Sequence, residues 1–262
     1  MKNYLPCTIF TIAFFLCIKV NAFYSDTIQI SPQQIKTNVL IEGTHSYLVY
    51  FKMAKDAPRT QAQFWTRTIS KTTHNGKDAI EVNQVWEDKD SIMHSVKSVC
   101  DAKTFQTFTH DSWWKQRGTT SVDFENKTIA VNNKTITPDD TSRMAKRLLQ
   151  CFQSAQNEYH LNWHLDLEVF PILPYKQGVT FIIPFYDPGT TATFTKVAYT
   201  VTGSAELTGY NQQKIDCWLL SHESKGNKEL FWISKKTKEV LKLEQEINGK
   251  IYRYKIKLGF SI

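Results

Sequence analysis

Apolar and polar residues alternate along the C-terminal stretch from Leu230 to Ile262, as they do in β-strands that bury one face. The pair Asn248-Gly249 interrupts this alternation and predicts a two-residue hairpin turn, because a type I′ turn needs positive φ at both central residues. A loop of this length places Glu244 opposite Arg253 on a charged face. The other face is predicted to be apolar, with Leu241, Leu243, Tyr252, Tyr254 and Ile256.

A second hairpin of the same construction is predicted around Asn75-Gly76, between strand-like residues 60–71 and 78–87. With Asn75 and Gly76 as the loop, Trp65 lies opposite Trp86 and Ile69 lies opposite Val82.

Short runs of β-branched and aromatic residues, separated by turn residues, fill most of the remaining chain. We expect strands at residues 39–53, 91–101, 104–114, 119–125, 128–136, 179–186, 191–201, 203–210 and 213–222. Strands that follow one another without intervening helices predict an antiparallel meander. Because a sheet of roughly ten or more strands twists strongly, we expect it to curl into an open or incomplete barrel.

One helical insert is predicted at about residues 138–169. The sequence Thr137-Pro138-Asp139-Asp140 is typical of a helix start. An apolar stripe at helical spacing follows, made of Met144, Leu148, Cys151, Phe152 and Ala155. We expect this insert to pack on the concave face of the sheet, which gives a mainly β fold with a single domain over residues 23–262.

The N-terminus has the pattern of a secretory signal peptide. A basic start at Lys2 precedes the apolar run from Cys7 to Ile18, and Ala22 supplies the small residue for cleavage before Phe23. We therefore expect an exported protein, periplasmic or secreted, with no transmembrane segment in the mature chain. An uncleaved anchor and a lipid-modified Cys17 are the alternatives, although the apolar run is short for a bilayer span.

Charge and cysteine content narrow the class of protein. The formal net charge is +7, or +5 once Lys2 and Lys19 of the leader are removed. Because the lysines are dispersed, we interpret them as solvated strand faces and expect no nucleic-acid partner. The three cysteines after the leader, Cys100, Cys151 and Cys217, cannot form a disulfide scaffold, and we expect them to be buried.

Two patterns suggest chemistry only weakly. His160, His164 and Glu168 follow one another at intervals of four, but Leu161 stands where a metalloprotease helix has its catalytic Glu, so we interpret them as a solvated polar helix face. His110-Asp111-Ser112 cannot form a relay, because neighbours on a strand point to opposite faces. We expect no catalytic residue, no metal site and no cofactor.

The aromatic residues are the strongest candidates for a binding surface. Seven tryptophans occur in the chain, and in a β-meander most of them fill the core. Neighbours on a strand face opposite ways, so one of Trp113 and Trp114 should point away from the core. The predicted ligand-binding residues are Trp65, Trp86, Trp113, Trp218, Trp232, Tyr252 and Tyr254.

Four features together resemble an uncharacterised family of exported bacterial proteins, known as a domain of unknown function. They are the leader, Phe170-Pro171-Ile172-Leu173-Pro174 before Gly178, Asp216-Cys217-Trp218, and the strand and turn from Leu230 to Glu244. The resemblance covers about residues 90 to 260. It implies an open, curved barrel similar to that of periplasmic lipoprotein carriers, with a concave and partly apolar cavity; it transfers no catalytic residue.

The sequence therefore favours a non-enzymatic exported protein that binds a lipid or another apolar ligand in a concave β cavity. A structural or interaction protein of the bacterial envelope, which binds a protein partner or a glycan, is the second hypothesis. A metal-dependent hydrolase at His160 and His164 is the third.

Overall fold

The computed structural model describes residues 26–209 and 211–259. The predicted leader, its cleavage site at Ala22 and the alternative at Cys17 lie outside the described residues.

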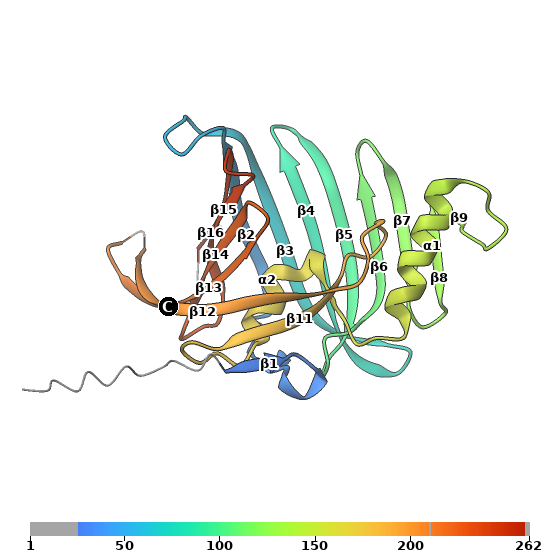
Figure 1. The fold of residues 1–262 in the computed structure, drawn as a ribbon, viewed down its shortest axis with the longest axis horizontal. Helices are drawn as coiled ribbons and strands as arrows, with labels where there is room; N and C mark the ends of the chain where they lie inside the picture. The colour runs from blue at the N-terminus through green and yellow to red at the C-terminus, as the bar shows by residue number, and fades with distance from the viewer. Residues whose placement is uncertain (1–25, 210, 260–262) are drawn as a thin grey trace, which may run out of the picture.

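Strands make up most of the described chain (Figure 1). They are β1 (Thr27–Gln29), β2 (Gly43–Lys52), β3 (Thr60–His74), β4 (Lys77–Asp88), β5 (Ser91–Asp101), β6 (Thr107–Trp114), β7 (Gly118–Asp123), β8 (Thr128–Val131), β9 (Lys134–Thr135), β10 (Leu161–Asn162), β11 (Thr180–Tyr186), β12 (Thr195–Thr208), β13 (Lys214–Ser224), β14 (Asn227–Ser234), β15 (Val240–Ile247) and β16 (Ile251–Leu258). The helices are α1 (Arg143–Gln156) and α2 (Asp166–Val169), with 3-10 turns η1 (Pro32–Gln34), η2 (Thr37–Val39), η3 (Trp163–Leu165) and η4 (Phe170–Ile172).

All strands belong to one 16-stranded sheet. Two antiparallel meanders, β2 to β9 and β11 to β16, join where β16 pairs with β2, so the last strand lies beside the second in the middle of the sheet. β1 and β10 add parallel pairs to β11. Because no described strand links β1 to β9, the sheet stays open while it curls, which confirms the predicted mainly β, incomplete barrel (Figure 1).

Helix α1 packs between the strand pair β7–β8 and the end of β11. One side packs Leu148 and Phe152 on Val122 and Ile129 of β7 and β8. The other side packs Cys151 and Ala155 against Tyr186 at the end of β11. The helix therefore joins β7–β8 to β11 through side chains where backbone pairing is absent.

The start of α1 differs from the prediction. The helix is capped by Ser142, whose Oγ accepts a hydrogen bond from the backbone N–H of Ala145 at 3.0 Å, so it begins five residues after Pro138. Met144 is 63% exposed, and Ala145 takes its place on the buried stripe. The early carboxylate Asp140 instead accepts from the backbone N–H of Thr137 and pairs with Lys134.

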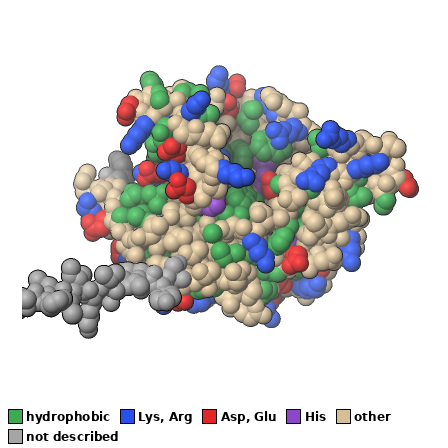
Figure 2. Space-filling view, in the orientation of Figure 1, with side chains coloured by type: hydrophobic (Ala, Val, Ile, Leu, Met, Phe, Trp, Pro, Cys, Tyr) green, Lys and Arg blue, Asp and Glu red, His purple; other side chains and the backbone are tan. Residues whose placement is uncertain are grey.

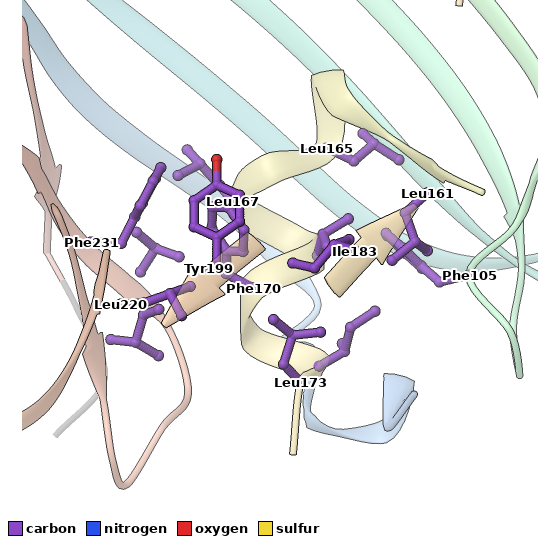
Figure 3. Packing of buried hydrophobic residues seen from close by; sticks show 14 of the residues in the cluster. Phe105, Leu161, Leu165, Leu167, Phe170, Leu173, Ile183, Tyr199, Leu220 and Phe231 are labelled. Carbon is purple, nitrogen blue, oxygen red and sulfur yellow. The ribbon is translucent and has the colours of Figure 1, made fainter. Parts of the chain in front are cut away.

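The core lies inside the curve of the sheet, around the segment η3–α2–η4 (Figure 3). Phe170 packs its ring 4.9 Å from that of Tyr199 on β12 and 4.5 Å from that of Phe231 on β14. Leu165 and Leu167 are buried in the same cluster. The predicted placement of helical residues on the concave side is thus correct for η3–α2–η4, and these residues fill the interior.

The hairpin at Asn75-Gly76 has the predicted register. Trp65 pairs with Trp86 and Ile69 with Val82, and both Asn75 and Gly76 have positive φ. The two-residue loop leaves His74 opposite Lys77, as a type I′ turn requires.

The predicted register at Asn248-Gly249 is wrong by one residue. Ile247 pairs with Ile251, so Lys250 belongs to the loop and Glu244 lies opposite Tyr254. Since the side-chain period of a strand is two, this shift reverses β16. Tyr252, Tyr254 and Ile256 face outward, and Arg253, Lys255 and Lys257 face the interior beside Leu243.

Cys100, Cys151 and Cys217 are all buried, as predicted, and none is paired with another among the described residues. Burial raises the pKa of the Cys100 thiol to about 12 and that of Cys217 to about 11. The helices of the described part of the chain are too short or too polar to cross a membrane.

Candidate functional site

A hollow opens on one face of the molecule, between the arm that contains β14–β16 and the arm that contains β5–β7 (Figure 2). Hydrophobic and histidine side chains are visible inside it. We call this feature the concave hollow. Inward-facing residues of β3 to β6 form its back wall, and the segment η3–α2 lies at its centre.

Aromatic rings line the back wall in one row. Trp65 and Trp86, which pair across β3 and β4, stack with ring centroids 3.8 Å apart. Trp86 continues edge-on to Trp114 at 5.4 Å, and His94 of β5 stacks on Trp114 at 3.7 Å. The row arises because Trp65, Trp86, His94 and Trp114 are register partners on four neighbouring strands.

His164 of η3 contacts this row from inside the hollow. Its ring lies 5.5 Å from that of His94 and 5.0 Å from that of His110. Its Nε2 atom is 3.1 Å from a carboxylate oxygen of Asp187, the first residue after β11. Asp187 keeps 31% of its side chain exposed, so this contact lies at the boundary between the buried row and solvent.

Burial holds the pKa of His94 at about 4, so its imidazole is neutral at physiological pH. Its Nδ1 atom donates to the backbone carbonyl of Trp113 at 2.8 Å, which places the single proton on Nδ1. Its Nε2 atom is therefore a hydrogen-bond acceptor, and it is buried without a partner among the described residues.

His110 has the opposite tautomer. Burial, with His164 and His94 nearby, lowers its pKa well below the usual value. The amide of Asn162 donates to its Nδ1 atom at 3.0 Å, and the Asn162 oxygen accepts from the backbone N–H of His164. The proton of His110 therefore lies on Nε2, which is a buried donor without a described partner.

Ser98 also contacts His110, with Oγ 2.9 Å from Nδ1. Both residues are fully buried, so a substrate has no access to this hydroxyl–imidazole pair. Asp111 points to the opposite, exposed face of β6, as the alternation of the strand requires.

A buried ion-pair network fixes α2 beneath the hollow. Arg67 binds Glu168 through two hydrogen bonds, Nε to Oε1 at 2.8 Å and Nη2 to Oε2 at 2.7 Å. Its Nη1 reaches Asp166 at 3.3 Å, and Nη2 also donates to the carbonyl of His164 at 2.6 Å. Lys255 donates to Asp166 at 2.6 Å and lies 4.7 Å from the centre of the Trp65 ring.

The pKa shifts within this network differ in direction: burial raises the pKa of Glu168, although Arg67 opposes that effect. Burial raises the pKa of Asp166, but the positive charges of Lys255 and Arg67 outweigh it, so the carboxyl has a pKa below its usual value. Burial lowers the pKa of Lys255 to about 8. The dispersed lysines are thus not all solvated: Lys255 and Lys257 are buried, and Lys257 pairs with Glu239 at 3.2 Å.

The sequence-predicted site residues divide between two faces. Trp65 and Trp86 line the hollow, and Trp218 lies on the same inner face against Tyr175. Trp113 is on the outer side of β6, opposite Trp114, so one of the two tryptophans points outward as expected. Trp232 is also outside, where its Nε1 donates to Glu244 at 3.0 Å.

Tyr252 and Tyr254 face outward because of the shift in β16. Tyr254 stacks on Tyr50 at 5.0 Å. Both tyrosines line an outer groove of about 370 Å³ that also includes Lys55, Glu244 and Glu246. The structure therefore does not bring Trp113, Trp232, Tyr252 and Tyr254 together with Trp65 and Trp86.

Sequence reasoning missed the places of His94, Trp114 and Asp187 in the hollow; it put His164 on a solvated helix face and Arg253 on the charged face of the sheet. One signal was present. Trp65, Arg67 and Ile69 alternate on one face of a strand whose tryptophan and isoleucine were expected inside, which requires Arg67 to be buried with a carboxylate partner.

The interpretation of His160, His164 and Glu168 as a solvated helix face is wrong. His160 precedes β10, His164 is in η3 and Glu168 is in α2, so no single helix carries them. His160 and Glu168 are buried, because His160 packs against Phe124 and Tyr186 and Glu168 binds Arg67. No three His, Cys, Asp or Glu side chains in the described residues are arranged to hold a metal ion.

Comparison with known proteins gives a family and a distant structural relative. The family described as "Protein of unknown function (DUF3108)" matches residues 46–257. No curated protein matches the sequence. A crystal structure of a β-barrel-like protein of domain of unknown function DUF1849 from Brucella abortus is similar at 5% identity and a TM-score of 0.42, covering 84% of this chain and 98% of that chain. The predicted resemblance to a domain of unknown function is confirmed.

Proposed function

The chain belongs to the DUF3108 family of proteins of unknown function, and within it we propose that this protein binds an amphipathic molecule in the concave hollow without transforming it. The observation that carries the proposal is the composition of the hollow. Apolar ring surface from Trp86 and Trp114 lies directly beside the polar pair His164 and Asp187. A ligand with one apolar and one polar part matches that arrangement.

The filled interior supports a position for the apolar part above α2, in the hollow. Phe170, Tyr199 and Phe231 occupy the space between η4 and the β12–β14 wall (Figure 3). The cavity between Leu167, Tyr47 and Val240 holds only about 20 Å³, far below the range for small-ligand pockets. We therefore place an acyl chain above α2, along the tryptophan row, and not beneath it.

The proposal also includes a role in binding and not in hydrolysis, and export from the cell. The hydroxyl–imidazole pair of Ser98 and His110 is sealed from solvent, which supports a binding role over hydrolysis.

The leader pattern supports export to the periplasm or the medium. N-terminal sequencing of protein recovered from its own host tests export with removal of the leader. A chain that starts at Phe23 supports export, and one that starts at Met1 contradicts it.

Native mass spectrometry of the protein purified from its own host tests the binding proposal. We expect a bound species of the mass of an acylated molecule that is lost on organic extraction and rebinds when the extract is returned. Only unliganded protein, in repeated preparations without detergent, together with no uptake of added dodecanoate or monododecanoylglycerol, would contradict the proposal.

The outer groove supports a second candidate, the binding of an envelope partner. Its half-buried Tyr252 and Tyr254 belong to a residue type that is enriched in protein interfaces, and Glu244, Glu246 and Lys55 beside them would form a polar rim. Photo-crosslinking from position 254 in cells should then capture one reproducible partner, whereas crosslinking from position 113 should not. Equal labelling from both positions would remove this candidate.

A further inference from the structure

Arg253 projects from β16 toward the interior, where it is the register partner of Gln245 on β15 and Phe51 on β2. Its guanidinium forms no hydrogen bond or ion pair with any described residue, and its Nε atom is buried. Arg67, on the same concave face, differs from Arg253 because its guanidinium has partners. All three of its guanidinium nitrogens are used, on Glu168, Asp166 and the carbonyl of His164.

The acidic groups nearest to Arg253 already have other partners. Glu229 accepts from the hydroxyl of Tyr199 and from the amide of Gln245, each at 2.7 Å. Asp166 accepts from Lys255 and Arg67. Both carboxylates influence Arg253 through charge, but neither comes within ion-pair distance of it.

A charged group in this position is costly unless something else binds it. Burial lowers the pKa of Arg253, and the charges of Asp166 and Glu229 oppose that effect. A guanidinium remains protonated in proteins, so Arg253 cannot avoid the free-energy cost of a buried charge by losing its proton. Its planar set of donors matches the two oxygens of a carboxylate or a phosphate.

We propose that Arg253 binds the anionic head group of the amphipathic ligand, through a carboxylate or a singly charged phosphate. This inference rests on the proposed function, because it names the polar end of the molecule that the hollow holds. Asp166 and Glu229 add negative charge nearby, which disfavours a doubly charged phosphate monoester and favours a group with one negative charge. The apolar remainder extends toward Trp86 and Trp114, because Trp65 is buried beneath Lys255 and Trp86.

Calorimetric titration of the full mature protein with four probes tests the assignment. The probes are dodecanoate, dodecyl phosphate, neutral monododecanoylglycerol and inorganic phosphate. In the unmodified protein we expect dodecanoate to bind about 10- to 100-fold more tightly than monododecanoylglycerol, the size of a charge-assisted hydrogen-bond pair. Dodecyl phosphate, which carries more charge at neutral pH, should bind more weakly than dodecanoate.

The variants Arg253→Gln, Arg253→Lys and Arg59→Gln locate the effect. Arg253→Gln should remove the preference for dodecanoate over the neutral probe, and Arg253→Lys should keep part of it. Arg59 is the matched control, because it is exposed and lies over Tyr50 on the outer face, 4.8 Å from the ring centre. Thermal unfolding of each variant verifies that it is folded, and the Arg253 side chain has no partner whose loss would unfold the protein.

The outcomes separate this inference from the proposed function. If no amphipathic probe binds, both are overturned. If dodecanoate and monododecanoylglycerol bind equally, or if Arg253→Gln keeps the preference, only the role of Arg253 is overturned. If inorganic phosphate alone binds as tightly as dodecanoate and depends on Arg253, the site is one for free anions and the head-group assignment is wrong.

Discussion

Arg67 on β3 and Glu168 on α2 form a buried, bidentate ion pair between residues that are 101 positions apart in the chain. This pair ties the short helix to the back wall of the hollow. It also positions η3, because the same guanidinium binds the carbonyl of His164. The floor of the candidate site is therefore held by charge as well as by apolar packing.

Removal of one member of this pair should strongly destabilise the fold. We expect Arg67→Met to lower the free energy of unfolding by about 3–5 kcal/mol, because Glu168 would lose its buried cation and Asp166 would keep only Lys255. Lys71→Met on the same strand is the control: Lys71 pairs with Glu42 in solvent, and its loss should cost less than about 1 kcal/mol. Urea denaturation at neutral pH measures both; similar losses for the two variants would contradict the structural role of Arg67.

Removal of the Arg253 charge, unlike that of Arg67, should not destabilise the fold. Because its guanidinium has no described partner, Arg253→Met should leave the free energy of unfolding unchanged or raise it by about 1 kcal/mol or more. Thermal unfolding of the ligand-free protein provides the measurement. A loss of several kcal/mol would show that Arg253 serves the fold, as Arg67 does.

Acid should weaken the fold through the buried histidines. In the folded protein the pKa of His94 is about 4 and that of His110 is well below its usual value, whereas unfolded histidine takes up a proton near pH 6.5. The unfolded chain therefore binds more protons as pH falls from about 6.5 toward 4, and stability decreases over that range. We expect a loss of roughly 1–2 kcal/mol per histidine between about pH 7 and pH 5, measured by urea denaturation. His94→Gln should reduce that loss; an unchanged pH dependence would contradict the buried neutral state.

The loop after β11 should be sensitive to a single methyl group. A Cβ on Gly189 would lie 2.6 Å from Cγ2 of Thr120, on β7 at the other arm of the sheet. Gly178 has nearly the same positive φ, and a Cβ there meets nothing within 4 Å. We therefore expect Gly178→Ala to cost about 1–2 kcal/mol and Gly189→Ala about 1–3 kcal/mol more. Equal costs in urea denaturation would mean that the loop does not depend on its contact with β7.

The two Asn-Gly hairpins show how far the sequence determines the fold. At Asn75-Gly76 the pattern and the turn agree, and the register was predicted correctly. At Asn248-Gly249 the tyrosines and isoleucine of β16 suggested an apolar inner face, but Lys250 enters the loop and turns Arg253, Lys255 and Lys257 inward. The inward charges are compensated by Asp166 and Glu239, which lie far away in the sequence. Local patterning cannot anticipate that compensation.

The candidate site was predictable only in part, for the same reason. Trp65 and Trp86 follow from a local hairpin, so their stacking could be expected. The contacts of His164 with His94 and Asp187 join η3 to strands on both arms of the sheet, and these contacts depend on how the sheet curls. Strand alternation separated Trp113 from Trp114 but could not decide which of them faces inward.

Titration of the mature protein with dodecanoate, compared between Trp114→Leu and Trp113→Leu, tests the central claim most directly. The two tryptophans are neighbours on β6, but only Trp114 belongs to the aromatic row of the hollow. We predict that Trp114→Leu weakens binding at least about tenfold, in line with the loss of a buried aromatic contact, whereas Trp113→Leu changes it less than about twofold. Equal binding by both variants, with the unmodified protein also binding dodecanoate, would contradict a ligand site in the concave hollow.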